Sequence, residues 1–307
     1  MKPKNVQNDH PLTIQEQYLR KHKNHHRQVA FLRIFLLGIF LILWEISADA
    51  YWIDSFFFSS PRRVVLCLIQ LWTERSLPMH IGITLLETIL SFLLVFVVSL
   101  LLATLLWFSD KLSEILEPYL VLLNSLPKSA LAPLFIVWLG TGINTIIIAG
   151  ISVAVFGSII SFYTAFHQVD PEKEILIRTL GGNRRDIFFK VVLPGSVPTL
   201  LSTTKVNIGL SLVGVIIGEV LGARRGLGYL IIYGSQVFQL DMVISSILLL
   251  CVIAMLLYLL TQSLEHCSQS ILTSGLTFFA ATVGVAAISK MELLRSICLL
   301  ISRGALI

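Results

Sequence analysis

Long uncharged stretches dominate this sequence and limit what it can fold into. Four runs contain no Asp, Glu, Lys or Arg, namely 88–109, 129–169, 242–264 and 266–289. A helix needs about 20 mostly apolar residues to cross a bilayer, and each run is long enough. Only 13% of the 307 residues are charged, too few to cover the surface of a soluble fold. The chain is therefore predicted to be an all-α polytopic membrane protein, and not a soluble enzyme, a disordered regulator or a disulfide scaffold.

Six membrane spans are predicted from the apolar runs, and a seventh is left open. The six lie near 30–50, 85–108, 115–139, 143–166, 198–219 and 242–264. The doubtful seventh would be 270–289, within a tail at 266–307 that is either an extra span or not inserted in the membrane. A signal peptide cleaved near Ala50 is the weaker alternative for the first run, because the charged leader is long and many spans follow.

The positions of Lys and Arg predict the orientation of the chain. With six spans, 12 of these cations fall on the side of the N-terminus, in the basic leader 1–29 and in the loops 109–114 and 167–190, and 5 fall on the other side. Cytoplasmic loops of membrane proteins carry this excess, so both termini are expected in the cytoplasm. The net charge of +5 then reflects topology in a lipid bilayer, and no nucleic-acid partner is expected. The histidine cluster at 22–26 is interpreted as part of the solvated basic leader.

Two segments between the spans carry helix signals of their own. Ser60-Pro61 is typical of a helix N-terminus, and apolar residues at helical spacing up to 72 predict an amphipathic helix on the outer face. In the inner loop, a helix over 172–180 is predicted to stop at Gly181-Gly182. A second helix with one apolar face is expected to follow, with a capping box at Asn183 and Asp186, and to end at Leu193-Pro194. This helix–turn–helix with one apolar face is a candidate docking surface, and the alternative is a helix that rests on lipid headgroups.

The sequence offers no enzyme chemistry of its own. It has no GxxxxGK[ST] loop, so any ATP must be bound by a partner subunit, and no cofactor is predicted. The four cysteines are scattered, which argues against a metal site or a disulfide framework. An intramembrane protease built on Ser152 and His167 is rejected, because Ser152 is followed by Val-Ala and not by glycine.

Four motifs together resemble those of a transporter family. The loop from Asp170 through Gly181, followed by nine residues and Val-Val-Leu193-Pro194, resembles the cytoplasmic loop that contacts the ATPase in ABC-importer permeases. The stretches 125–142, 218–231 and 58–64 resemble the third span and the outer segments of the nitrate/sulfonate/taurine branch. At the Glu-Ala-Ala positions of that loop, this chain has the more apolar Ile175-Leu176-Ile177. The tail from about 267 onward has no counterpart.

The resemblance implies a fold, a location and partners. It implies a type I ABC-importer permease domain over 30–265, with a coupling loop at 170–190, in a bacterial plasma (inner) membrane. Its partners would be a second permease copy, cytoplasmic ATP-binding subunits, and a periplasmic or surface-tethered solute-binding protein. The residues implied in coupling to the ATPase subunit are Glu174, Ile175, Leu176, Ile177, Gly181, Val191, Leu193 and Pro194.

Charged residues inside predicted spans mark a candidate translocation path. Lys128, Lys205 and Glu219 interrupt otherwise apolar spans, and a charge at such depth is costly unless it is paired or functional. The lysines are interpreted either as partners of carboxylates such as Glu87 or Glu219, or as a positive field for an anion. The solute is expected to be a small anion such as a sulfonate, taurine or nitrate. Alternatives are bicarbonate or a thiamine-precursor pyrimidine carried by the same mechanism, or a gradient-driven secondary transporter.

Overall fold

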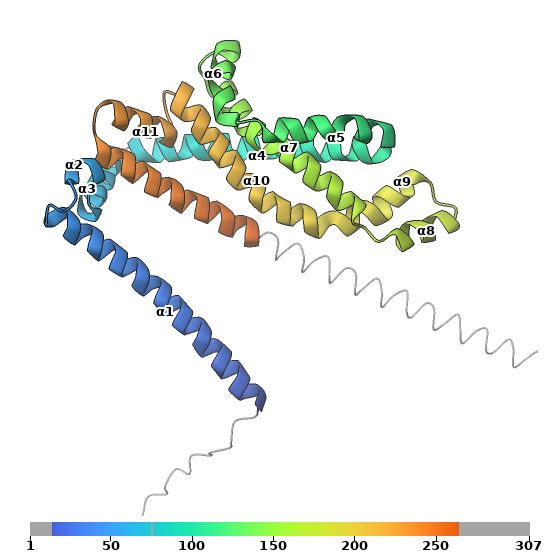
Figure 1. The fold of residues 1–307 in the computed structure, drawn as a ribbon, viewed down its shortest axis with the longest axis horizontal. Helices are drawn as coiled ribbons and strands as arrows, with labels where there is room; N and C mark the ends of the chain where they lie inside the picture. Colours follow the sequence, from blue (N-terminus) through green and yellow to red (C-terminus); the bar gives the residue numbers. More distant parts are fainter. Residues whose placement is uncertain (1–13, 75, 264–307) are drawn as a thin grey trace, which may run out of the picture. The chain divides into compact units, whose positions relative to one another are not determined.

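The computed structural model describes residues 14–74 and 76–263, and every regular element in this part is helical (Figure 1). The elements are α1 (Ile14–Asp49), α2 (Ser55–Phe58), α3 (Pro61–Thr73), α4 (Ser76–Phe108), α5 (Asp110–Ser125), α6 (Lys128–Leu139), α7 (Ile143–His167), α8 (Pro171–Thr179), α9 (Arg184–Ile187), the π-helical turn η1 (Phe188–Val192), α10 (Leu193–Gly222), α11 (Leu227–Gln236) and a last helix, Leu240–Ser263. They group into two compact units. Among the described residues, one contains 14–74 together with 234–245, and the other contains 76–233 and 246–263.

The helical class and the membrane spans are confirmed. Five described helices are long and apolar enough to cross a membrane, and a sixth span results if α5 and α6 count as one. The predicted second span begins nine residues too late, because α4 starts at Ser76 and includes His80 and Glu87. The possible seventh span at 270–289 and the tail at 266–307 lie outside the described residues.

The third predicted span, 115–139, is wrong as one straight helix. α5 and α6 are inclined by 94° to each other. Leu126, between them, is extended with φ −62° and ψ 139°, because the residue before a proline is kept out of the helical region and Pro127 follows. Lys128 then folds back, and its ammonium donates to the carbonyl oxygens of Leu123, at 3.0 Å, and of Asn124. A cation is favourable at these unpaired C-terminal carbonyls of α5.

The second unit is built around α4, α7 and α10, which pack side by side (Figure 1). α10 carries glycines four residues apart at Gly214 and Gly218. A Cβ atom at Gly214 would lie 2.7 Å from the Cα of Gly150 on α7, and one at Gly218 would lie 2.9 Å from the Cα of Ile146. The backbones of α7 and α10 are therefore in direct contact, as small residues at this spacing allow between membrane helices.

α4 joins this pair without any glycine between 83 and 108. It uses Ser91, Ser99 and Ala103 instead, all fully buried. The Ser91 hydroxyl donates to the carbonyl oxygen of Ile147 at 3.4 Å, and that of Ser99 donates to the carbonyl oxygen of Val155 at 3.3 Å. Small polar residues thus allow the close approach of α4 to α7 that glycines allow between α7 and α10.

The first unit contains α1, α2 and α3. α3 begins as its sequence predicts, with the Ser60 hydroxyl accepting from the Arg63 N–H at 3.4 Å and Pro61 in first position. Glu45, a charge inside the first span, accepts from the backbone N–H of Arg62 at 3.0 Å. This hydrogen bond gives the carboxylate a partner near the C-terminal end of α1.

Candidate functional site

The 170–190 loop begins with the short helix α8, whose start and end are stabilised by residues of the same segment. The Asp170 carboxylate accepts from the Glu172 N–H at 3.0 Å, and Pro171 fills the first helical position. Glu172 and Glu174 lie in the first turn and Arg178 in the last, as the helix dipole favours. The predicted helix at 172–180 is confirmed with its bounds shifted by one residue.

α8 ends in a glycine turn that sets the direction of the next helix. The N–H of Gly181 donates to the carbonyl oxygen of Arg178 at 3.0 Å, and that of Gly182 donates to the carbonyl oxygen of Ile177 at 2.9 Å. This pair of bonds is the Schellman motif, which needs a left-handed residue, and Gly181 has φ +82°. A Cβ atom at Gly181 would have open space, whereas one at Gly182 would lie 2.5 Å from the Cγ2 of Ile177. Gly181 is thus required by its φ angle, and Gly182 by close packing.

The second half of the loop differs from its prediction. Asn183 and Asp186 form the expected capping box, with the Asn183 N–H donating to the Asp186 carboxylate at 3.0 Å. The predicted stop at Leu193-Pro194 is wrong, because the π-helical turn η1 leads directly into α10. Pro194 lies in the first turn of α10, where a residue without an N–H is tolerated.

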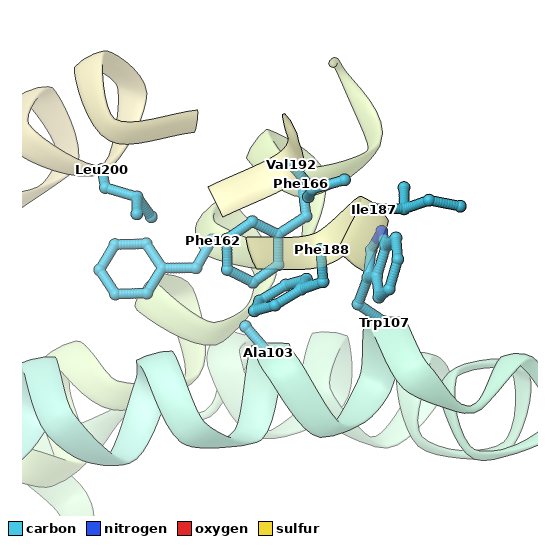
Figure 2. Close-up of a cluster of buried hydrophobic side chains, with 8 residues drawn as sticks. All are labelled: Ala103, Trp107, Phe162, Phe166, Ile187, Phe188, Val192 and Leu200. Carbon is cyan, nitrogen blue, oxygen red and sulfur yellow. The ribbon is translucent and has the colours of Figure 1, made fainter. Parts of the chain in front are cut away.

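An apolar cluster anchors this half of the loop to the ends of three long helices (Figure 2). Phe188 is 2% exposed. Its ring centroid is 5.0 Å from that of Trp107 on α4 and 5.3 Å from that of Phe166 on α7. The other buried members are Ala103, Phe162, Ile187, Val192 and Leu200. The loop is therefore packed onto α4, α7 and α10 together.

Arg184 adds a polar contact at the edge of this cluster. Its guanidinium donates to the carbonyl oxygen of Trp107 at 2.9 Å and to the Asp110 carboxylate at 2.8 Å. The same group lies 5.3 Å from the centre of the Trp107 ring, within the range of a cation–π contact. Arg184 thereby ties the start of α9 to the connection between α4 and α5.

The loop presents a different apolar surface to solvent. Ile175, Leu176 and Leu180 are 61%, 57% and 76% exposed. The second helix of the predicted helix–turn–helix is buried through Ile187 and Phe188, so the exposed apolar residues lie on or beside its first helix, α8. The role of the loop as a docking surface stays a prediction. We call Ile175, Leu176 and Leu180 the exposed apolar face of the loop.

The predicted coupling residues divide between these two sides. Ile175, Leu176 and Gly181 are exposed, as is Pro194. Glu174 and Ile177 are half-buried, and Ile177 packs against the anchoring cluster. The remaining two, which are also half-buried, are Val191 and Leu193. The structure thus gathers the group at one loop, with its exposed apolar members on α8.

The predicted path residues have different surroundings. Lys128 is bound to carbonyl oxygens of α5 and not to a carboxylate, and Lys205 lies half-buried in the middle of α10. Glu219 is fully buried near the end of α10. Its Oε1 accepts from the Thr84 hydroxyl at 2.7 Å, and its Oε2 accepts from the N–H of Gly228 at 2.6 Å. A role of these three residues in transport stays a prediction.

Glu219 belongs to a polar network that holds the turn at 226–228. The Gly226 N–H donates to Nδ1 of His80 at 2.9 Å, and the Leu227 N–H donates to the Thr84 hydroxyl at 2.9 Å. Gly226 has φ +113°, and a Cβ atom there would meet the Glu219 carboxylate. Only glycine therefore fits at 226. We call His80, Thr84 and Glu219 the turn-binding network.

Sequence reasoning missed most of this network. His80 and Thr84 lie more than 130 residues from their partners, so no local pattern connects them. The available signal was their position at the polar start of an apolar helix, four residues apart and therefore on one face. The rejected protease pair is separated in the structure as well. Ser152 and His167 are both on α7, about 22 Å apart by helical rise.

Three curated relatives share sequence with most of this chain. A probable ABC transporter permease protein of Haemophilus influenzae is 30% identical over 234 residues, which are 76% of this chain and 94% of the relative. A formylaminopyrimidine transport permease protein of Halalkalibacterium halodurans is 28% identical over 62% of this chain and 75% of its own length. A taurine transport system permease protein of Escherichia coli is 26% identical, with 78% and 89% covered.

The fold and a family model agree with these relatives. A chain from a bacterial ABC transporter involved in the import of the acidic polysaccharide alginate superimposes with a TM-score of 0.58 at 16% identity, covering 80% of this chain and 98% of that one. The family described as "Binding-protein-dependent transport system inner membrane component" matches residues 95–266, more than half of the sequence. The chain therefore belongs to this family of membrane permeases.

Proposed function

We propose that this permease is the membrane-spanning subunit of an ATP-driven importer and that the exposed apolar face of its 170–190 loop docks on a separate ATP-binding subunit. A second copy of the chain completes the pathway, and a solute-binding protein delivers the solute from outside. The permease itself catalyses no reaction, because ATP is bound and hydrolysed by the partner. The N-terminus and the loop lie in the cytoplasm, as the cation distribution favours.

The two-sided construction of the loop is the observation that carries this proposal. One side is packed through Phe188 and Ile187 onto the ends of α4, α7 and α10. The other side exposes Ile175 and Leu176 on α8. Apolar residues exposed on a short helix outside the apolar spans are typical of a surface that binds another protein.

This construction suits the transmission of a rigid-body movement. A partner that pulls or pushes α8 also moves α9 and η1, because the Gly181–Gly182 turn is hydrogen-bonded on both residues. The anchoring cluster then passes the displacement to three spans at once. Closure of ATP-binding subunits would in this way change which side of the membrane the pathway faces.

The solute is proposed to be a small molecule with an oxyanion group, such as a sulfonate, taurine or nitrate, since one relative is named for taurine transport. A thiamine-precursor pyrimidine is the second candidate, which the relative named for formylaminopyrimidine transport favours. The gradient-driven alternative has no support, because the matching family is one of binding-protein-dependent systems.

Leu176→Glu tests the docking proposal. It places a charge on the exposed apolar face without touching the anchoring cluster. We expect recruitment of the ATP-binding subunit, measured by copurification from membranes, to fall by about tenfold or more, as for a central interface residue. ATP-dependent uptake should be lost in parallel. Leu112→Glu, on a leucine exposed near the start of α5, is the matched control. Normal recruitment and uptake with Leu176→Glu would contradict the proposal.

A further inference from the structure

Two buried carboxyl groups are in contact beside the turn 226–228. Glu87 on α4 is 3% exposed, and Glu219 on α10 is fully buried. A side-chain hydrogen bond joins the two groups. Ionised carboxylates have only acceptor atoms, so a hydrogen bond between two carboxyl groups requires a proton on one of them. The contact therefore indicates that the pair holds one proton.

The other partners of Glu219 fit an ionised carboxylate. Its Oε1 accepts from the Thr84 hydroxyl at 2.7 Å, and its Oε2 accepts from the backbone N–H of Gly228 at 2.6 Å. A backbone N–H can only donate, so Oε2 must be an acceptor. A Cβ atom at Gly228 would lie 2.7 Å from the Cβ of Glu219, so the turn is packed directly against this side chain. Hydrogen bonds to an ionised carboxylate are stronger than those to a neutral acid, which makes Glu219 the better anion of the pair.

The surroundings of Glu87 fit a neutral carboxylic acid instead. Its Oε2 has no hydrogen-bond partner among the described residues. A buried oxygen without a donor costs much more free energy when the group is charged than when it is neutral. The side chain lines a cleft of about 500 Å³ together with the exposed Arg224 and Arg225. In the described part of the chain, however, no ion pair joins Glu87 to either arginine. Glu87 is thus the better carrier of the proton.

We propose that Glu87 and Glu219 form a proton-binding site, in which Glu87 is a neutral acid that donates to the Glu219 carboxylate and so helps to hold the turn 226–228. Loss of the proton puts two negative charges in contact in a buried place, and their repulsion loosens the turn from α4. In the loosened state Glu87 faces water and ionises as an ordinary glutamate does. Loosening therefore releases a proton, and a rise in pH favours it.

The other titratable groups around the pair leave a pH window in which it can be tested alone. His80 accepts from the Gly226 N–H through Nδ1 at 2.9 Å, and its ring stacks on that of Tyr229. A protonated imidazole could not accept this bond, but histidine ordinarily titrates near pH 6.5. Tyrosine and arginine, represented here by Tyr229, Arg224 and Arg225, ordinarily titrate at about pH 10 and above. The residues at the start of α7 that line the cleft are not titratable. Between about pH 7 and pH 9, the carboxyl pair is therefore the group expected to respond.

Infrared spectroscopy of the full-length permease, in a detergent without ester or carboxyl groups, tests for the proton directly. A neutral carboxylic acid has a C=O stretching band that is distinct from the bands of a carboxylate and that shifts in D₂O. We expect this band in the wild type at about pH 7 and its loss in Glu87→Gln. Glu114→Gln, at an exposed glutamate of α5, is the matched control and should keep the band. Absence of the band from the wild type, or an equal band in Glu87→Gln, would overturn the proposal.

Trypsin cleavage at Arg224 and Arg225 measures how firmly the turn is held. From about pH 7 to pH 9, cleavage of the wild type, corrected for the rate of the protease on a short arginine peptide, should rise at least about threefold and at most about tenfold per pH unit, the limit for release of one proton. Glu87→Gln, whose amide donates to Glu219 without losing a proton, should be cut slowly at both pH values, and Glu87→Ala rapidly at both. Cleavage of the wild type that does not change with pH would overturn the proposal, whether or not the variants fold. Wild-type pH dependence retained in Glu87→Gln would do the same.

Discussion

The two ends of the α4–α7–α10 core are stabilised by different kinds of interaction. At the loop end, Phe188 and its neighbours form an apolar cluster in which rings and aliphatic side chains pack without fixed directions. At the opposite end, the turn 226–228 is bound by directional hydrogen bonds from backbone N–H groups to His80, Thr84 and Glu219. Burial of apolar surface is non-directional, whereas a hydrogen bond weakens steeply when its geometry changes.

This difference suits the two ends to different roles. A loop that follows a moving partner benefits from contacts that survive small shifts. A turn that must keep one position against α4 benefits from contacts that hold one geometry. Variants at each end, with matched controls, test this difference.

Phe188→Ala should have the largest effect. Removing a fully buried aromatic ring from a packed cluster costs about 3–5 kcal/mol. The neighbouring Phe189 is 61% exposed, so Phe189→Ala is a control of the same chemistry one position away. Thermal unfolding of the two variants in nanodiscs measures the difference. Equal midpoints would show that the cluster does not anchor the loop.

Glu219→Ala should have the next largest effect, at the other end. It leaves the Gly228 N–H without its buried acceptor, which costs about 1–3 kcal/mol. The loosened turn should also be cut faster by trypsin at Arg224 and Arg225, while Glu219→Gln, which keeps an oxygen, should be cut less. Glu114→Ala, at an exposed glutamate of α5, serves as the control. Unchanged cleavage in Glu219→Ala would remove the network's role.

Substitutions at Gly181 should have the smallest effect on stability. A left-handed residue other than glycine costs about 1–2 kcal/mol, and asparagine tolerates this conformation better than valine. Gly181→Val should therefore impair uptake and ATPase recruitment while the protein still inserts, and Gly181→Asn should retain most of both. Uptake assays with membranes of matched permease content compare the two. Full uptake with valine would show that the left-handed turn is not needed for coupling.

Local signals predicted the elements that the chain builds from neighbouring residues. The cap at Ser60-Pro61, the capping box at Asn183 and the glycine turn at 181 all depend on residues within a few positions, and the structure has each of them. The spans were predicted for a similar reason, because apolar length is a property of one segment.

Features that depend on distant partners could not be predicted in this way. The apolar face of the second loop helix has the same pattern whether it meets lipid, another protein or α4, and only packing shows that Phe188 is turned inward. From the sequence alone, Glu219 is a costly charge inside a span. Only the structure shows that Thr84 and Gly228 donate hydrogen bonds to its carboxylate. The bend at Leu126 did have a local signal, Pro127, which was outweighed by the continuous apolar run.

Cysteine labelling tests the central claim, that the exposed apolar face of the loop is the cytoplasmic docking surface. In a background without the native cysteines, Leu176→Cys is exposed to a membrane-impermeant maleimide from either side of the membrane, with and without the ATP-binding subunit. We predict labelling only from the cytoplasmic side, and protection when the subunit is bound. Ala223→Cys, directly after α10 at the opposite end of the core, should be labelled only from outside. Labelling of Leu176→Cys from outside, or labelling that the bound subunit does not reduce, would contradict the account.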